Sequence, residues 1–206
     1  MSLLELAAEF ITVTCVGALS PGPLTLAVAS RGAEEGWEAG VKAAVGHVAV
    51  ELPLVILTGL GASALLADKR ATTLLSLAGG AALLIFALLL LKSALNWAGG
   101  GRGIAVRVSS IALGAALSLL NPNFIAWWAT AGLKVVVDVV SGGGLALLAL
   151  LYPLHAGIDL WWLTLVAHAS RKGVTLNEKV GPALTFIAAL LMACYGVAFI
   201  LGALQP

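Results

Sequence analysis

The tetrapeptide Ser20-Pro21-Gly22-Pro23 limits the possible folds of this chain more than any other stretch, because it interrupts an apolar run from Phe10 to Ala29. Without it, that run is long enough to cross a lipid bilayer as one helix. Each proline removes a backbone N–H donor and clashes with the preceding turn, so a straight helix cannot pass. Serine is a good helix cap, and proline fits the first helical position. We therefore predict a second helix that starts at Pro21, with its positive N-terminal end at membrane depth.

A second break, Asn121-Pro122, interrupts the apolar run from Val108 to Gly132 in the same way. Irregular backbone at membrane depth is tolerated only where protein or a water-filled cavity surrounds it. Paired breaks in corresponding segments of two halves indicate the substrate site of a transporter. We predict that this site contains both breaks and nearby residues: Ser20, Pro21, Gly22, Pro23, Asn121, Pro122, Asn123 and Trp127.

The composition excludes a water-soluble domain, since 61% of the 206 residues are hydrophobic and only 10% are charged. The net charge is +1 and the basic residues are scattered, which does not indicate nucleic-acid binding. Cys15 and Cys194 lie far apart in apolar segments, without the spacing of a zinc site or a disulfide framework. We therefore expect an integral membrane protein without a cofactor, in which both cysteines are small buried side chains.

Six apolar runs of about 20 residues, the length that crosses a bilayer, occupy most of the chain. They leave no room for a soluble domain, so residues 1–206 are expected to form a single all-α transmembrane domain. The predicted spans are Phe10 to Ala29, Ala43 to Leu66, Thr72 to Leu95, Val108 to Gly132, Leu145 to Ala167 and Val180 to Leu204. The predicted polar connections are Arg31 to Lys42, Asp68 to Arg70, Asn96 to Arg107, Lys134 to Gly144 and His168 to Lys179.

Lysine and arginine are unevenly distributed between alternate connections. The first, third and fifth contain eight of them if Lys92, just before the third, is included, whereas the termini and the other two connections contain three. Cytoplasmic loops carry the excess of basic residues, so we predict a multi-pass protein of the cell membrane with both termini outside. Three spans in each half then enter the membrane from opposite sides. This predicts 3+3 inverted repeats, about 1–98 and about 106–206, with helices one and four broken at the proline motifs.

Each half also has a histidine and a carboxylate four residues apart on one helix face: His47 with Glu51, and His155 with Asp159. Each carboxylate lies about nine residues from the cytoplasmic end of its predicted span, which is ~13 Å deep in a core of ~30 Å. A charge there costs on the order of 2.5–3.5 kcal/mol, so we expect these groups to face the interior and to be functional. Burial favours the protonated form of a carboxyl group, which suits a proton carrier. In the structural alternative, each carboxylate only bonds its own histidine and fixes helix packing.

Two tryptophan pairs, Trp127-Trp128 and Trp161-Trp162, lie deeper than Trp37 and Trp97, which sit near connections as interfacial anchors do. At least one member of each deeper pair is expected to face protein. The sequence leaves open whether these side chains line the transport pathway or pack against ordinary neighbours.

Three motifs together are similar to the signatures of the lysine-exporter (LysE/RhtB) family of small amino-acid effluxers. They are the heptapeptide Gly17 to Pro23, the glycine-punctuated stretch Arg31-Gly32 to Gly46, and the hexapeptide Leu119 to Phe124. The resemblance implies a transporter, not an enzyme, that exports amino acids or related metabolites from the cytoplasm using the proton gradient. The chain departs from the family pattern beside the expected site, with Leu24 where asparagine is common, and Gly46-His47 where an acid commonly follows the glycine.

Two other classes of function are compatible with these residues. The His47/Glu51 and His155/Asp159 pairs could together form a four-ligand site in a divalent metal exporter, since imidazole suits Zn, Ni, Cu or Fe. A membrane enzyme or thiol carrier would need its two cysteines to approach each other, and their positions do not indicate this. The expected partners are a small-molecule substrate (an amino acid) and the lipid bilayer. Whether the chain acts as a monomer or a homodimer stays open.

Overall fold

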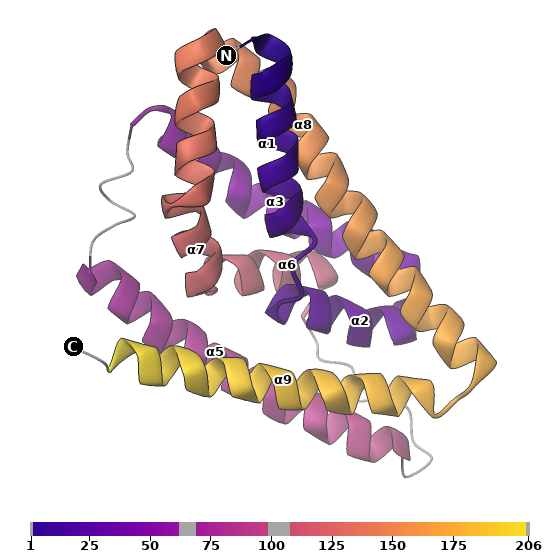
Figure 1. Cartoon of the computed structure of the whole chain (residues 1–206). Helices are drawn as coiled ribbons and strands as arrows, with labels where there is room; N and C mark the ends of the chain where they lie inside the picture. Colours follow the sequence, from indigo (N-terminus) through magenta and orange to yellow (C-terminus); the bar gives the residue numbers. More distant parts are fainter. Residues whose placement is uncertain (1, 62–68, 99–107, 205–206) are drawn as a thin grey trace.

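The computed structural model describes residues 2–61, 69–98 and 108–204, which form helices and contain no strand (Figure 1). This confirms the all-α prediction. In chain order the helices are α1 (Leu3–Ala18), α2 (Pro23–Glu35), α3 (Trp37–Gly59), α5 (Lys69–Ala98), α6 (Ser110–Leu119), α7 (Pro122–Ala129), α8 (Ala131–Leu176) and α9 (Val180–Ala203).

The first proline motif separates α1 from α2, which are bent by 63° relative to each other. The predicted break is present, but the second helix begins at Pro23 rather than Pro21, and its N-cap is Gly22 rather than Ser20. The residue before a proline is pushed towards extended backbone, and Gly22 is extended with φ −148° and ψ −176°. The Ser20 hydroxyl instead donates to the carbonyl of Val16 at 2.6 Å, so it belongs to the end of α1.

The second break agrees with the prediction in detail. Asn121 is the N-cap of α7, Pro122 occupies its first turn, and the Asn121 side chain accepts a hydrogen bond from the backbone N–H of Asn123 at 3.0 Å.

The polar connections are shorter than predicted, because the helices continue through most of Arg31 to Lys42, Lys134 to Gly144 and His168 to Lys179. Lysine, arginine and glutamate form helices well, so polarity alone does not end a helix. Two of the interruptions are glycines with positive φ, Gly36 (φ 77°) between α2 and α3 and Gly144 (φ 68°) within α8, whereas residues 177–179 separate α8 from α9. Figure 1 shows α8 turning back on itself near the N-terminal end of the molecule. Asp68 and most of the predicted connection from Asn96 to Arg107 lie outside the described residues, whereas Lys69 and Arg70 begin α5.

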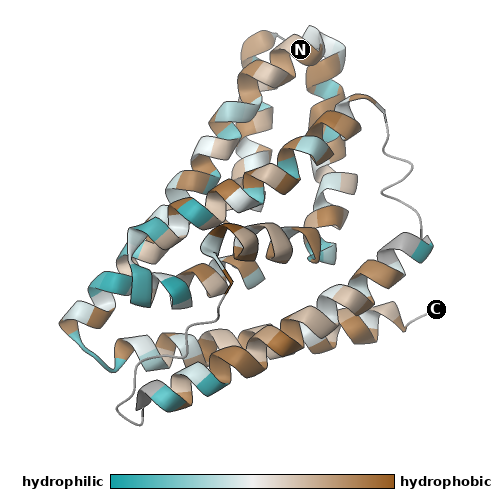
Figure 2. Ribbon diagram, turned by 180° about the vertical axis from the view of Figure 1, so that it is seen from behind, coloured by the Kyte–Doolittle hydropathy of each residue, from teal (hydrophilic) through white to brown (hydrophobic). Residues whose placement is uncertain are grey.

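Among the described residues, four helices are long and apolar enough to cross a membrane, or five if the bent α1–α2 pair forms one span. One of these four candidate spans is the whole segment 122–176, although the helix is kinked within it at Gly144. Apolar residues predominate along most of the helices in Figure 2. Many large apolar side chains on the outer faces are exposed, as expected of a surface that contacts lipid. The arrangement as six spans in two inverted repeats stays a prediction.

Two glycines allow α3 and α6 to cross in close contact. A Cβ atom on Gly46 would lie 1.9 Å from the carbonyl oxygen of Ile111, and one on Gly114 would lie 2.0 Å from that of Ala43. Small residues of this kind let helix backbones approach in membrane proteins. This crossing brings the face of α6 that carries Ser118 against the middle of α3.

Helices α5 and α9 pack along each other below the broken helices in Figure 1. Gly80 and Gly196 face each other at their contact, where a Cβ on either residue would lie within 3 Å of the other's carbonyl oxygen. From the sequence we expect predicted spans three and six to form scaffold, and among the described side chains of α5 and α9 only Tyr195 lines the cavity described below.

Candidate functional site

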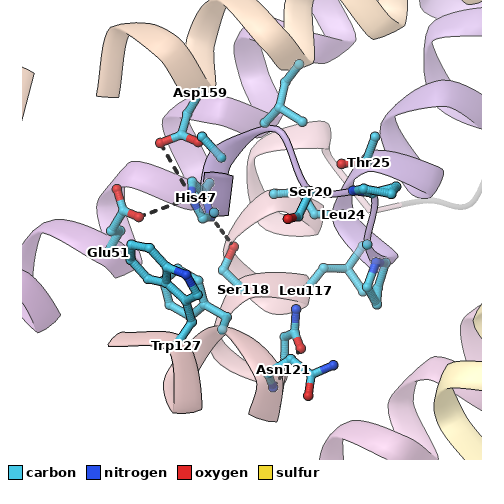
Figure 3. Close-up of a pocket in the computed structure, with 18 of the residues that line it drawn as sticks. Ser20, Leu24, Thr25, His47, Glu51, Leu117, Ser118, Asn121, Trp127 and Asp159 are labelled. Atoms are coloured by element: carbon cyan, nitrogen blue, oxygen red, sulfur yellow. Dashed lines mark hydrogen bonds and ion pairs between the residues drawn. The ribbon is translucent and has the colours of Figure 1, made fainter. Parts of the chain in front are cut away.

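A cavity of about 270 Å³ lies between the two broken helices and the central parts of α3 and α8. Figure 3 shows residues of both breaks and of both His–carboxylate pairs around it. Pro122 is the one predicted site residue that does not line it. The predicted residues that do are Ser20, Pro21, Gly22, Pro23, His47, Glu51, Asn121, Asn123, Trp127, His155 and Asp159.

The Glu51 carboxylate on the floor of this cavity is only 2% exposed and is held by three donors. Its Oε1 accepts from Trp128 Nε1 at 3.2 Å and faces His155 Nε2 at 3.1 Å. Its Oε2 accepts from the Tyr152 hydroxyl at 3.1 Å. Hydrogen bonds to an ionised group are stronger than those between neutral groups, and together they offset the burial of this carboxylate.

The Asp159 carboxylate lies beside this network and is 4% exposed. Its Oδ2 is 3.3 Å from Nε2 of His155 and 3.8 Å from Nε2 of His47, but it accepts no hydrogen bond from either ring. The two predicted pairs therefore form one cluster across α3 and α8. The structural alternative expected each carboxylate to bond only its own histidine, whereas His155 contacts Glu51 of the other helix.

Helix α6 orients the other imidazole. The Ser118 hydroxyl donates to the carbonyl of Gly114 at 2.7 Å, so its oxygen is left to accept from Nδ1 of His47 at 2.6 Å. Nε2 of His47 then points to the carboxylates, 3.5 Å from Glu51 Oε1. The dashed lines in Figure 3 connect His47 to all three side chains: Ser118, Glu51 and Asp159.

The other end of the cavity is formed by the proline breaks, where Ser20, Pro21 and Asn123 are exposed. The first amides of a helix have no partner within the helix. At the start of α2 the cap is Gly22, which has no side chain to supply one. The N-terminus of α2 thus offers backbone N–H groups and a positive dipole end to the cavity, whereas Asn121 already caps α7.

Two members of the cluster, Ser118 and Tyr152, are not among the site residues predicted from the sequence. Tyr152 lies three residues before His155 and seven before Asp159, which is the spacing of one helix face. Three polar residues on one face of an apolar helix could therefore have indicated Tyr152 as part of the site. No sequence signal indicated Ser118, because its contact with His47 depends on how α3 and α6 cross.

The tryptophan prediction is confirmed for the first pair, in which Trp128 is buried and Trp127 lines the cavity. In the second pair Trp161 is exposed and Trp162 is half-buried.

His47, Glu51 and Asp159 each have one potential ligand atom within 4.8 Å of the others. Imidazole and carboxylate ligands fit a divalent transition metal, so these side chains could also hold an ion.

Apolar helices surrounding a cavity that contains ionisable side chains, with helix breaks at its edge, are typical of a membrane transporter. The chain belongs to the LysE type translocator family, whose family model matches residues 15–203. This confirms the family resemblance, and it identifies a multi-pass membrane protein of a family of transporters. Comparison with curated proteins and with solved structures gave no match.

Proposed function

We propose that this translocator is a secondary exporter that moves amino acids or related small metabolites out of the cytoplasm in exchange for protons. One observation carries the proposal: a single cavity contains both proline breaks and both His–carboxylate pairs. In a LysE type translocator, a substrate with one acidic and one basic group would need both features: a helix N-terminus for its acidic group and carboxylates for its basic group.

The two ends of the cavity suit the two ends of an amino acid. The free backbone N–H groups at the start of α2 would hold the substrate carboxylate, with the positive dipole end adding to the attraction. Glu51 and Asp159 would attract the ammonium group or carry a proton. Trp127 and Leu117 provide part of the apolar wall between these ends.

Transport would follow from the arrangement of helices that we infer from the sequence. With 3+3 inverted repeats, rocking one repeat against the other would open the cavity to each side in turn. The distribution of basic residues supports a cell-membrane protein with both termini outside.

The second candidate function is export of a divalent metal ion, which the closeness of His47, Glu51 and Asp159 favours. Two observations weigh against it. Glu51 already accepts from three donors, and the positive end of α2 at the same cavity would oppose a cation.

The test is efflux from proteoliposomes loaded with each amino acid in turn, under an imposed proton gradient. We expect the wild-type protein to export one chemical class of amino acid, and Asp159→Asn to lose this activity. Asp138→Asn is the matched control, because this carboxylate forms its ion pair with Lys134 away from the cavity. If no amino acid is exported, while Zn²⁺, Ni²⁺, Cu²⁺ or Fe²⁺ is, the metal function replaces the one proposed.

A further inference from the structure

The two carboxylates of the cluster have very different hydrogen-bond environments, and this distinguishes their roles. We propose that Asp159 is the residue that binds the ammonium group of the substrate, whereas Glu51 is a positioning residue that orders the side chains around it. This assignment rests on the function proposed above and states which of the two carboxylates contacts the substrate.

Three side chains of the protein already contact the Glu51 carboxylate at hydrogen-bond distance. An indole N–H can only donate, so Oε1 of Glu51 must act as an acceptor towards Trp128. The Tyr152 hydroxyl occupies Oε2, and His155 shares Oε1. A substrate that bound Glu51 directly would have to replace these donors, which leaves buried N–H and O–H groups unpaired.

Asp159 differs from Glu51 in its hydrogen bonding. No residue in the described part of the chain donates a hydrogen bond to it, and its Oδ2 is fully buried. The nearest donor, Nε2–H of His155, is engaged with Glu51. A buried carboxylate that accepts no hydrogen bond is costly, so this position favours an additional cationic donor.

His47 contributes a second acceptor beside Asp159. Because its Nδ1–H is bonded to Ser118, His47 directs Nε2 towards Oδ2 of Asp159, 3.8 Å away, and in the neutral form of the ring this nitrogen is an acceptor. An ammonium group has three donors and no acceptor. It therefore matches the vacant acceptors of Asp159 and His47, both of which line the cavity.

The first experiment identifies the reactive carboxyl group without requiring transport. Purified protein in lipid vesicles is treated with an apolar carbodiimide, which modifies accessible protonated carboxyl groups within membranes, and the labelled residue is located by mass spectrometry. We expect the label on Asp159 and not on Glu51. Asp159→Asn should lose the label, and Glu51→Gln should keep it.

The second measurement tests the ligand class. Methylammonium chloride serves as the probe for the ammonium group, and potassium chloride at the same concentration controls for ionic strength. Methylammonium should slow labelling of Asp159 and potassium should not. Label on Glu51, no protection by methylammonium, or protection by ZnCl₂ alone would each overturn the assignment.

The efflux assay separates this assignment from the proposed function. If amino-acid efflux is observed but the labelling pattern is reversed, then the exporter stands and the roles of the two carboxylates are wrong. If labelling follows the expected pattern but no amino acid is transported, then Asp159 binds an ammonium group of a different substrate.

Discussion

The Tyr152 hydroxyl donates a hydrogen bond to Oε2 of Glu51 across 3.1 Å and so connects α8 to α3 at the floor of the cavity. The two residues are 101 positions apart in the sequence. With Trp128 and His155, this contact determines where the Glu51 carboxylate lies.

Tyr152→Phe removes this donor and should destabilise the protein by about 1.5–3 kcal/mol, as expected for a hydrogen bond to a charged group. The measurement is thermal unfolding of the purified protein in detergent. A double-mutant cycle with Glu51→Gln provides the control, because the effect of Tyr152→Phe should become much smaller once the charge is gone. Equal effects in both backgrounds would show that the hydroxyl does not act through Glu51.

Ser118→Ala should impair transport more than stability, because it removes the acceptor that orients His47. We expect efflux to fall by about tenfold, equivalent to about 1.4 kcal/mol. Ser170→Ala is the matched control, since that hydroxyl makes the same kind of bond to the carbonyl four residues earlier, away from the cavity. Efflux that is equal in the two variants would argue against a role for the His47 orientation.

Gly114→Val should disrupt the crossing of α3 and α6, since even a Cβ would lie 2.0 Å from the carbonyl oxygen of Ala43. Overpacking of this kind costs about 1–3 kcal/mol or more, and here backbone would have to move. Thermal unfolding should show a large loss, and the cavity should lose its Ser118 contact. Gly157→Ala is the comparison, because a Cβ there meets nothing within 4 Å in the described structure, and this variant should unfold at the wild-type temperature or above.

Gly144→Ala should destabilise the turn within α8 through backbone conformation alone. This glycine has a φ of 68°, and a Cβ would meet no described atom within 4 Å. With ψ −174°, this residue lies in a backbone region that essentially only glycine adopts, and another residue there costs about 1–3 kcal/mol. Gly202→Ala has equal space and no positive φ, so it should be neutral in the same unfolding measurement. If both variants behave alike, then the turn at Gly144 does not require glycine.

Local chemistry made several features predictable from the sequence. Proline cannot continue a helix wherever it occurs, so both breaks were expected, and Asn121 before Pro122 is a cap in any context. The His–carboxylate pairs follow from helix periodicity in the same way. The predicted start of α2 was wrong by two residues. Both Pro21 and Pro23 are compatible with the first helical position, and the helix begins at Pro23.

The connections were harder to predict, because polar residues are compatible with both loops and helix ends. Gly36 and Gly144 mark the real turns, but a glycine does not reveal from sequence whether its φ is positive.

The sequence by itself thus determined that the chain is helical, apolar, twice broken by proline and supplied with two buried His–carboxylate pairs, because each of these depends only on neighbouring residues. Only the tertiary structure decided that His155 contacts Glu51, that Trp128 and Tyr152 donate to the same carboxylate, and that no described residue donates a hydrogen bond to Asp159. Those contacts depend on which faces of α3, α6 and α8 meet. Close contacts at small residues such as Gly46 and Gly114 determine how these helices cross. Such contacts join residues far apart in the sequence, so local periodicity does not predict them.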